Sequence, residues 1–309
     1  MEESNQHSII FKENHPCKVI AEIGCNHKGD FSIAKEMIKI AHHRCNVDAV
    51  KFQKRCPREC LDEKTYDSSH PNPDYSYGST YGKHREFLEF DIDKHKQLKQ
   101  LVEQLGMEYS CSVWDQTSAK EIASLKPAWI KIPSACNENR ELLKTVINNF
   151  DGEIHVSLGM TTHKAQEKIV SFFEAEGRNQ DLILYACTSA YPVSDEDVCI
   201  LEIDRLTKKF EDKIKGVGFS GHHGGVAVDT AAYILGAEWV ERHFTLDRSW
   251  KGTDHAASLE PEGMRKVCLY ISSVAKAMKL KSNEILPIEE EQLIKLKSKQ
   301  TNFNTKLKK

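Results

Sequence analysis

GVGFSGHHGGVAVDTAAYILGAEWVERHFTL, residues 216–246, contains the unit from which the fold of this chain can be predicted. Two short apolar runs, 216–220 and 239–246, flank a segment with the spacing and Ala/Leu content of an amphipathic helix. A strand, a helix and a second strand in this order form a parallel pair whose strand ends are neighbours. His222 and His243 stand at or just beyond the two strand ends, so we expect the imidazoles to converge on one point.

The same alternation of a short apolar strand and an amphipathic helix repeats along the chain. The expected strands are residues 19–24, 49–54, 108–114, 129–134, 153–159, 182–189, 216–220 and 239–246. Eight such units in about 260 residues predict an α/β fold, a closed (β/α)8 TIM barrel. The alternative is an open doubly wound sheet, but no G-x-G-x-x-G motif follows the first strand.

We expect a single barrel domain with one long loop after its second strand. The predicted limits are an N-terminal extension at residues 1–18, the barrel at 19–280, and a C-terminal linker and lysine-rich tail at 281–309. The loop at residues 55–90 is rich in Tyr and charged residues, which favours an ordered lid over a floppy insertion. Tyr75, Tyr77, Tyr81 and Arg85 are the side chains expected to reach over the strand ends.

Composition excludes several classes of function. The net charge of −3 argues against a nucleic-acid surface. No apolar run approaches the roughly 20 residues that span a bilayer, and the N-terminus lacks the features of a signal peptide, so we predict a cytoplasmic protein with no membrane association. The 10 cysteines are scattered, which indicates reduced thiols. A zinc site at Cys56 and Cys60 is disfavoured because no second pair matches them.

The active site of such a barrel lies at the C-terminal ends of its strands. Lys51 and Lys131 lie in apolar strands, where an unpaired ammonium group is costly to bury, so each needs an anionic partner. One interpretation is an internal ion pair with Glu22. The other, which we favour, is a cradle for a phosphate or carboxylate, with donors from further strand-end hydroxyls. These hydroxyls belong to Ser134, Ser157 and Ser220.

His222 and His243 are candidate metal ligands, because neutral imidazole is the commonest metal-donating side chain. Glu241 and Asp247 are close enough in sequence to add carboxylates. The alternative is that both histidines only satisfy local hydrogen bonds, but the density of charged and imidazole groups in this region indicates a site.

Seven motifs resemble, in order and spacing, those of the sialic acid (N-acetylneuraminate) synthase family. They are AEIGCNHKGD, AVKFQK, IKIPSA, SLGM, CTSAYP, GFSGHH and ERHFTLDRSWKGTDHAASLEPE. The resemblance covers residues 19–279. It implies a metal-dependent condensation of phosphoenolpyruvate with an N-acetylmannosamine-like aldose, which gives a nonulosonic acid and phosphate.

The resemblance also implies roles for individual residues. His222 and His243 fall on ligands of a divalent metal, Mn²⁺ in the first place, with Co, Mg, Fe or Zn as alternatives. By the resemblance, phosphoenolpyruvate is bound by Lys51, Lys131, Ser134, Ser157 and Ser220, and the catalytic residues are Glu22 and His243. The acceptor sugar is bound by Tyr191, Glu241 and Asp247. Gln53, Ser189 and, from the long loop, Arg85 complete the expected substrate-binding set.

The chain also departs from the pattern of that family. Gly221 stands where the family usually has Asp, and Ala190 where it usually has Asn. Family members commonly carry a C-terminal antifreeze-like domain over the site, and we expect this chain to lack it. The cover is then the long loop, a second copy in a homodimer, or a separate partner chain.

Two other functions remain open on the sequence. One is condensation of phosphoenolpyruvate with a different aldose or sugar phosphate, as in octulosonate and heptulosonate synthases. The other is a non-catalytic sugar-binding paralogue.

Overall fold

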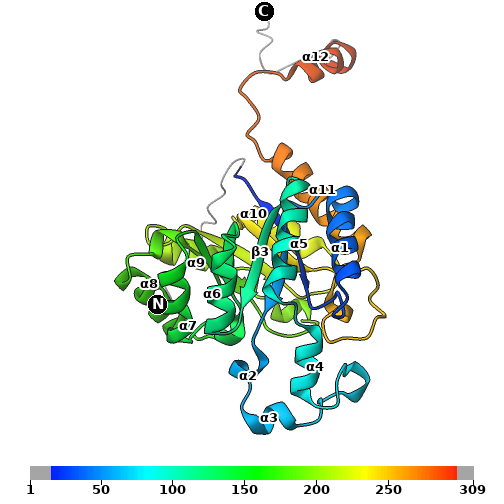
Figure 1. Ribbon diagram of the computed structural model, residues 1–309. Helices are drawn as coiled ribbons and strands as arrows, with labels where there is room; N and C mark the ends of the chain where they lie inside the picture. Colours follow the sequence, from blue (N-terminus) through cyan, green and yellow to red (C-terminus); the bar gives the residue numbers. More distant parts are fainter. Residues whose placement is uncertain (1–14, 298–309) are drawn as a thin grey trace, which may run out of the picture.

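The computed structural model describes residues 15–297, and its eight strands pair in parallel, each with the next, to close a barrel (Figure 1). The strands are β1 Lys18–Gly24, β2 Ala49–Lys54, β3 Glu108–Val113, β4 Trp129–Ile132, β5 Glu153–Ser157, β6 Leu182–Cys187, β7 Gly216–Gly221 and β8 Trp239–His243. The predicted (β/α)8 barrel is therefore confirmed, and the open-sheet alternative is excluded.

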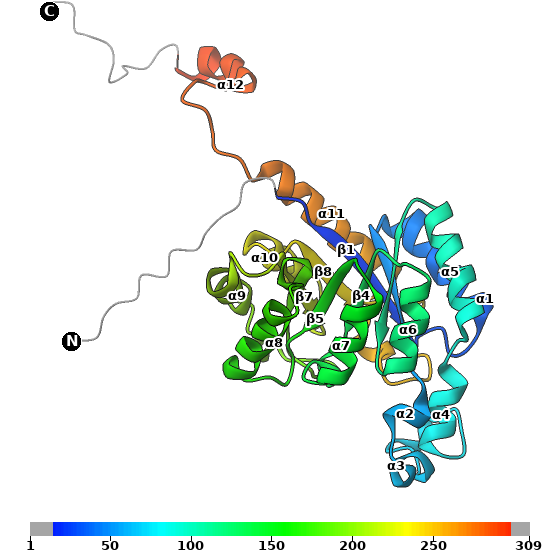
Figure 2. The ribbon, with the colours of Figure 1, turned by 60° about the vertical axis from the view of Figure 1, so that its left-hand side comes forward.

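Helices follow the strands and pack around the outside of the barrel (Figure 2). They are α1 Phe31–Ile40, α5 Ile92–Gln104, α6 Gln116–Ser124, α7 Arg140–Asn149, α8 His163–Ala175, α9 Glu202–Phe210, α10 Ala227–Ile234 and α11 Pro261–Ala277. No helix in residues 15–297 combines the length and the apolar character that crossing a bilayer requires.

The interior of the barrel is layered, because alternate residues of each strand point inward. One layer is an apolar cluster of Ile20, Ala49, Trp129, Ile183, Tyr185 and Trp239. Two residues further along β1, β2, β4 and β8, the same inward positions are charged: Glu22, Lys51, Lys131 and Glu241. The apolar layer therefore fills the barrel interior toward the N-terminal ends of the strands. The charged layer lies above it and forms the base of any cavity at the C-terminal ends.

The strand register brings these charged residues together. Glu22 lies opposite Lys51 of β2 on one side and opposite His243 of β8 on the other. Ser220 of β7 lies opposite Glu241 of β8. Since each pairing joins neighbouring strands at the same height, residues far apart in sequence meet in one layer.

The long loop after β2 forms three short helices, α2 Pro57–Cys60, α3 Glu63–Asp67 and α4 Tyr81–Leu88. They project beyond the barrel at the end where β2 finishes (Figures 1 and 2). Tyr66 packs so closely on Gly82 that a Cβ there would lie 2.2 Å from its ring. The Tyr77 hydroxyl donates to the Lys251 carbonyl at 2.5 Å, which ties the loop to the segment after β8.

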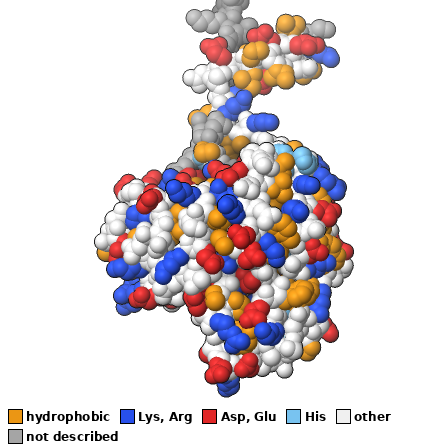
Figure 3. All heavy atoms as spheres, viewed as in Figure 1, with side chains coloured by type: hydrophobic (Ala, Val, Ile, Leu, Met, Phe, Trp, Pro, Cys, Tyr) orange, Lys and Arg blue, Asp and Glu red, His pale blue; other side chains and the backbone are white. Residues whose placement is uncertain are grey.

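At the opposite end of the barrel, the last α-helix, α12 Pro287–Gln292, stands away from the barrel (Figures 1 and 2). The face visible in Figure 3 carries acidic and basic side chains interspersed rather than a field of one sign. The predicted boundaries of the barrel domain, at residues 18 and 280, stay predictions. Residues 1–14 of the predicted N-terminal extension and residues 298–309 of the predicted tail lie outside the described residues.

Candidate active site

A cavity of about 290 Å³ opens at the C-terminal ends of the strands. It is lined by every predicted site residue except Asp247: Glu22, Lys51, Gln53, Arg85, Lys131, Ser134, Ser157, Ser189, Tyr191, Ser220, His222, Glu241 and His243. We call the group of Glu22, Lys51, Ser112, Lys131, Ser220 and Glu241 the floor. We call the group of Arg85, Met160, Tyr191, Thr253 and Asp254 the rim.

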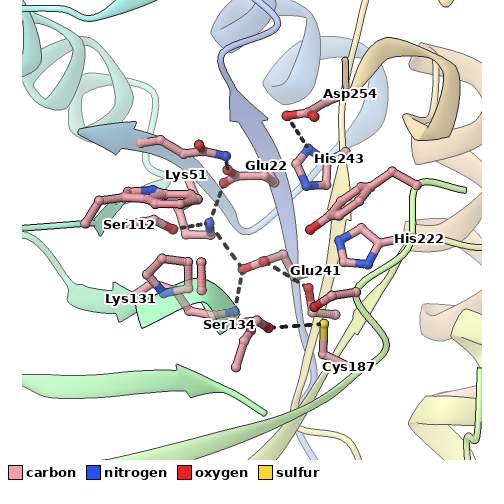
Figure 4. A pocket seen from close by; sticks show the side chains of 18 of the residues that line it. Glu22, Lys51, Ser112, Lys131, Ser134, Cys187, His222, Glu241, His243 and Asp254 are labelled. Carbon is pink, nitrogen blue, oxygen red and sulfur yellow. Dashed lines mark hydrogen bonds and ion pairs between the residues drawn. The ribbon is translucent and has the colours of Figure 1, made fainter. Parts of the chain in front are cut away.

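The floor is a buried network of two lysines and two carboxylates (Figure 4). Lys51 Nζ lies 2.5 Å from Glu22 Oε2 and 3.7 Å from Glu241 Oε2, and it donates to Ser112 Oγ at 2.7 Å. Lys131 Nζ donates to the same Glu241 Oε2 at 3.1 Å. Both lysines therefore have the internal ion pairs that sequence reasoning offered as the alternative, and both still line the cavity.

Burial and the ion pairs shift the pKa values of the two floor carboxylates, Glu22 and Glu241, in opposite directions. Burial raises the pKa of Glu241, but Lys131 and Lys51 more than offset this and lower it to about 2. Burial raises the pKa of Glu22, and the neighbouring Glu241 charge adds to the increase against the opposing effect of Lys51. Burial lowers the pKa of Lys131. Glu241 is thus a permanent anion, while Glu22 is the carboxyl that takes up a proton more readily.

Serine hydroxyls converge beside the floor around Gly159. A Cβ at Gly159 would lie 2.2 Å from Ser189 Oγ and 2.7 Å from Ser134 Oγ, so only glycine leaves both hydroxyls in place. Ser189 Oγ and Trp114 Nε1 are buried and have no hydrogen-bond partner among the described residues. Because buried donors are normally satisfied, these two are suited to a bound ligand that accepts hydrogen bonds.

The two predicted metal-binding histidines lie side by side on the opposite wall. The ring centroids of His222 and His243 are 5.4 Å apart. The Thr188 carbonyl lies 3.1 Å from His222 Nδ1, which fixes Nδ1–H as the donor and leaves the Nε2 lone pair free. Burial lowers the pKa of His222 to about 3, so its ring is neutral at physiological pH. His243 Nδ1 is buried and has no hydrogen-bond partner among the described residues.

This pair fits a divalent metal that also takes ligands from solvent or substrate. Residues 15–297 contain no group of three or more His, Cys, Asp or Glu side chains arranged to hold a metal ion. A metal here would therefore have two imidazole ligands and open positions, the arrangement expected of a catalytic rather than a structural site.

A buried ion pair holds the two histidine-bearing segments together. Arg242, next to His243, donates to Asp229 Oδ2 at 2.5 Å and to the His223 carbonyl at 2.6 Å. His223 follows His222, so the guanidinium links the loop after β7 to β8. A side chain at Gly221 would begin 2.7 Å from Phe219 and 2.9 Å from His223. The space that the family's aspartate would need is thus occupied by these two rings.

Two of the predicted acceptor-binding residues lie away from the rim. Asp247 does not line the cavity, because its carboxylate accepts hydrogen bonds from Ser249 instead. The carboxylate that faces the site from the same loop is Asp254, whose Oδ2 lies 3.9 Å from His243 Nδ1. Glu241 lines the cavity, but its hydrogen bonds place it in the floor, apart from Tyr191 and the rest of the rim.

The lid prediction is only partly matched. Of the four side chains expected to reach over the strand ends, Arg85 lines the cavity, whereas Tyr75, Tyr77 and Tyr81 do not. At the mouth, Met160 is 70% exposed and Tyr191 is 50% exposed. The loop therefore forms one wall of the mouth and leaves the rest open.

Sequence reasoning missed several residues of the cavity. Ser112 and Trp114 come from β3 and the residue after it, a strand for which the sequence predicted no site residue. Arg55, which also lines the cavity, pairs with Glu89 at 3.1 Å and stacks over Trp114. A serine near the end of a strand is a usable signal for Ser112, since the same signal identifies Ser134 and Ser157.

Comparison with known proteins gives a consistent result. The model of the NeuB family matches residues 37–283. The chain is 35% identical over 280 residues to N-acetylneuraminate-9-phosphate synthase of Homo sapiens, covering 89% of this chain and 75% of that one. It is 31% identical to N,N'-diacetyllegionaminic acid synthase of Campylobacter jejuni, covering 84% and 77%. The crystal structure of N-acetylneuraminic acid (sialic acid) synthetase from Leptospira borgpetersenii superimposes with a TM-score of 0.76 at 24% identity, over 96% and 97%.

Proposed function

This chain belongs to the NeuB family, and we propose that it condenses phosphoenolpyruvate with an N-acetylated amino sugar to give a nonulosonic acid and phosphate. The observation that carries the proposal is the pairing, in one cavity, of a buried lysine–carboxylate floor with two adjacent imidazoles. A floor of this kind suits a small polyanion, and the imidazoles suit a metal at the carbonyl of a second substrate.

Phosphoenolpyruvate is assigned to the floor and the neighbouring hydroxyls. Each ammonium has three N–H donors, and Lys131 donates one hydrogen bond to Glu241, so donors remain for an incoming anion. Ser189 Oγ and Trp114 Nε1 are unpaired donors next to it. Because these groups are buried and already ordered, they bind the anion with little reorganisation.

Glu22 is the residue we assign to proton transfer and charge stabilisation. In the reaction, C3 of phosphoenolpyruvate forms a bond to the aldehyde carbon, a water oxygen adds at C2, and the bond from C2 to the phosphate oxygen breaks. Positive charge develops at C2, and a carboxylate in a buried site stabilises it strongly. The raised pKa of Glu22 also suits it to accept the proton that water releases.

The wall of histidines is assigned to the aldehyde end of the acceptor. A divalent metal held by His222 and His243 would supply Lewis-acid polarisation of the aldehyde oxygen, with Mn²⁺ as the proposed ion. The Tyr191 ring lies against His222 at a centroid distance of 4.2 Å, tilted by 54°, and Asp254 faces His243, so both reach the same region. The part of the mouth that the long loop leaves open needs a cover to exclude water during the reaction.

An acceptor panel tests the proposal. The metal-loaded protein is given phosphoenolpyruvate with N-acetylmannosamine, its 6-phosphate, or a shorter sugar phosphate, and phosphate release is followed together with product mass. We expect turnover with an amino sugar. Turnover only with the shorter sugar phosphate would support an octulosonate- or heptulosonate-type synthase, and binding without turnover would indicate a non-catalytic paralogue.

A further inference from the structure

Arg85 differs from the other lysines and arginines that line the cavity, because its hydrogen bonds go to a neutral group. Lys51, Lys131 and Arg55 each have a carboxylate oxygen within 3.1 Å. Arg85 Nε and Nη2 instead donate to the Tyr81 hydroxyl at 3.1 and 2.7 Å. Among residues 15–297 no carboxylate oxygen lies within 4.0 Å of its guanidinium nitrogens, and Asp254 and Glu89 act on its charge only from a greater distance.

The fold holds this guanidinium in place on the rim. Tyr81 and Arg85 are one turn apart on α4, and the guanidinium lies 5.1 Å from the Tyr81 ring centroid. The loop that carries α4 is tied to the segment after β8 by the Tyr77 hydrogen bond to Lys251. Arg85 also lines a small adjoining cavity together with Thr253 and Asp254. It therefore stands on the Asp254 side of the mouth, as part of the rim and not of the floor.

The chemistry of the proposed reaction says what would reach this position. Phosphoenolpyruvate contributes carbons 1–3 of a nine-carbon product, so carbon 9 is carbon 6 of the acceptor. In the proposed function the acceptor's carbon 1 is at the histidines. Carbon 6 is at the other end of the acceptor, and it is the part that would lie at the rim, since Arg85 lines the same cavity as His222 and His243. A guanidinium has five N–H groups, of which Arg85 uses two, and the remaining donors match the bidentate geometry of a phosphate.

We propose that Arg85 binds the phosphate of a phosphorylated acceptor, so that this chain selects a hexosamine 6-phosphate over the free sugar. The inference rests on the proposed function and specifies the substrate class of the same site. The 35% identity to a relative named as a 9-phosphate synthase, against 31% to a legionaminic acid synthase, agrees with this direction. Tyr81 is a positioning residue, because it orients the guanidinium without reaching the substrate.

The test compares acceptors and variants at saturating phosphoenolpyruvate. Wild type, Arg85→Met and Arg85→Lys are assayed with N-acetylmannosamine and its 6-phosphate. Lys83→Met is the matched control, since Lys83 is on the same helix but 55% exposed and paired with Glu86. We expect Arg85→Met to lower kcat/KM for the phosphorylated acceptor at least about 10-fold, with partial recovery in Arg85→Lys. The loss of kcat/KM for the free sugar should be smaller than the loss for the phosphorylated acceptor. The KM of Arg85→Met for phosphoenolpyruvate, and all kinetic constants of Lys83→Met, should stay within about twofold of the wild type.

Equal losses on both acceptors, or a change confined to the KM for phosphoenolpyruvate, would overturn the inference. If the wild type turns over both sugars and Arg85→Met leaves their ratio unchanged, only the inference on Arg85 fails. If the wild type turns over neither, the proposed function fails. Calorimetric binding of the 6-phosphate to wild type and Arg85→Met then decides the role of Arg85, because it needs no turnover.

Discussion

The floor and the rim of this cavity differ in how completely their charges are paired. In the floor, Lys51, Lys131, Glu22 and Glu241 are at most 5% exposed and share ion pairs. In the rim, Arg85 has a neutral partner, and Met160 is 70% exposed. The floor is thus ordered before any ligand binds, which suits a substrate common to the whole reaction class. The rim is open and has hydrogen-bond donors without partners, which suits the acceptor sugar, the substrate that differs between synthases.

The largest expected effect comes from removing the two imidazoles that stand between floor and rim. The His222→Ala/His243→Ala double variant should lose Mn²⁺ binding and about 10³-fold or more in activity, since metal polarisation contributes several kcal/mol. His163→Ala, a histidine with a 66% exposed side chain on α8, is the control. Metal titration and phosphate release are the measurements, and full turnover by the metal-free double variant would contradict the assignment.

The pairing of the floor is tested by the next largest effect. Lys131→Met leaves Glu241 buried beside Lys51 alone, so we expect a loss of about 3 kcal/mol in unfolding free energy and about 10²–10³-fold in kcat/KM for phosphoenolpyruvate. Lys18→Met is the matched control. Lys18 is paired with Glu108 at 2.7 Å at the other end of the barrel, and both side chains are about 40% exposed. The Lys18→Met variant should lose at most about 1 kcal/mol of unfolding free energy, and its activity should not change. Urea unfolding with similar losses for both variants would contradict the distinction.

The hydroxyl cradle beside the floor is tested by a single methyl group. Gly159→Ala places a Cβ against Ser189 Oγ and Ser134 Oγ, so these hydroxyls must rotate away. We expect the KM for phosphoenolpyruvate to rise about 10-fold, the equivalent of one charge-assisted hydrogen bond. The KM for the acceptor should stay the same. Gly224→Ala is the control, because no heavy atom lies within 4 Å of the position that its new methyl group would take. Equal behaviour of the two alanine variants would show that the cradle is not used.

The smallest effect concerns the layer beneath the floor. Burial lowers the pKa of His155 to about 4, and its ring stacks on Trp129 at a centroid distance of 4.9 Å. In the unfolded chain its pKa is about 6.5. The unfolded state therefore binds more protons between these values, and stability is present above pH 6.5 and lost as pH falls toward 4. Between about pH 7.5 and about pH 5, the protonation of His155 in the unfolded chain lowers the free energy of unfolding by about 2 kcal/mol.

His155→Gln removes this titration while keeping a polar group near the Tyr185 hydroxyl, which lies 2.9 Å from His155 Nδ1. The unfolding free energy of the variant should fall about 2 kcal/mol less than that of the wild type over the same pH range. Parallel pH profiles for the two proteins would show that His155 is not neutral in the folded state.

The barrel and most of the floor can be predicted from the sequence, because both follow from periodicity. Inward positions repeat every two residues, so Glu22, Lys51 and Lys131 can be placed at strand ends from the sequence alone. The internal ion pairs enter there only as an alternative, because the sequence does not state which strand register joins them. In the structure the register joins Glu22 to Lys51 directly.

The rim could be predicted less well, because it is made of loops without periodicity. Asp247 and Asp254 are carboxylates of the same loop, and spacing alone does not tell which one faces inward. In the structure the loop turns at Gly252, whose φ is +147°. A hydrogen bond of 2.7 Å between the Thr245 hydroxyl and His255 Nδ1 holds the two ends of this turn together. This turn brings Asp254 to His243 and leaves Asp247 with Ser249.

The most direct test of the account follows the carbon that should form the new bond. Phosphoenolpyruvate labelled with ¹³C at C3 is supplied with unlabelled N-acetylmannosamine 6-phosphate, Mn²⁺ and the protein, and the mixture is read by NMR. We expect the label in the methylene carbon of a nine-carbon keto acid, with one phosphate released per product. Label appearing only in the methyl group of pyruvate, or remaining in unreacted phosphoenolpyruvate, would contradict it.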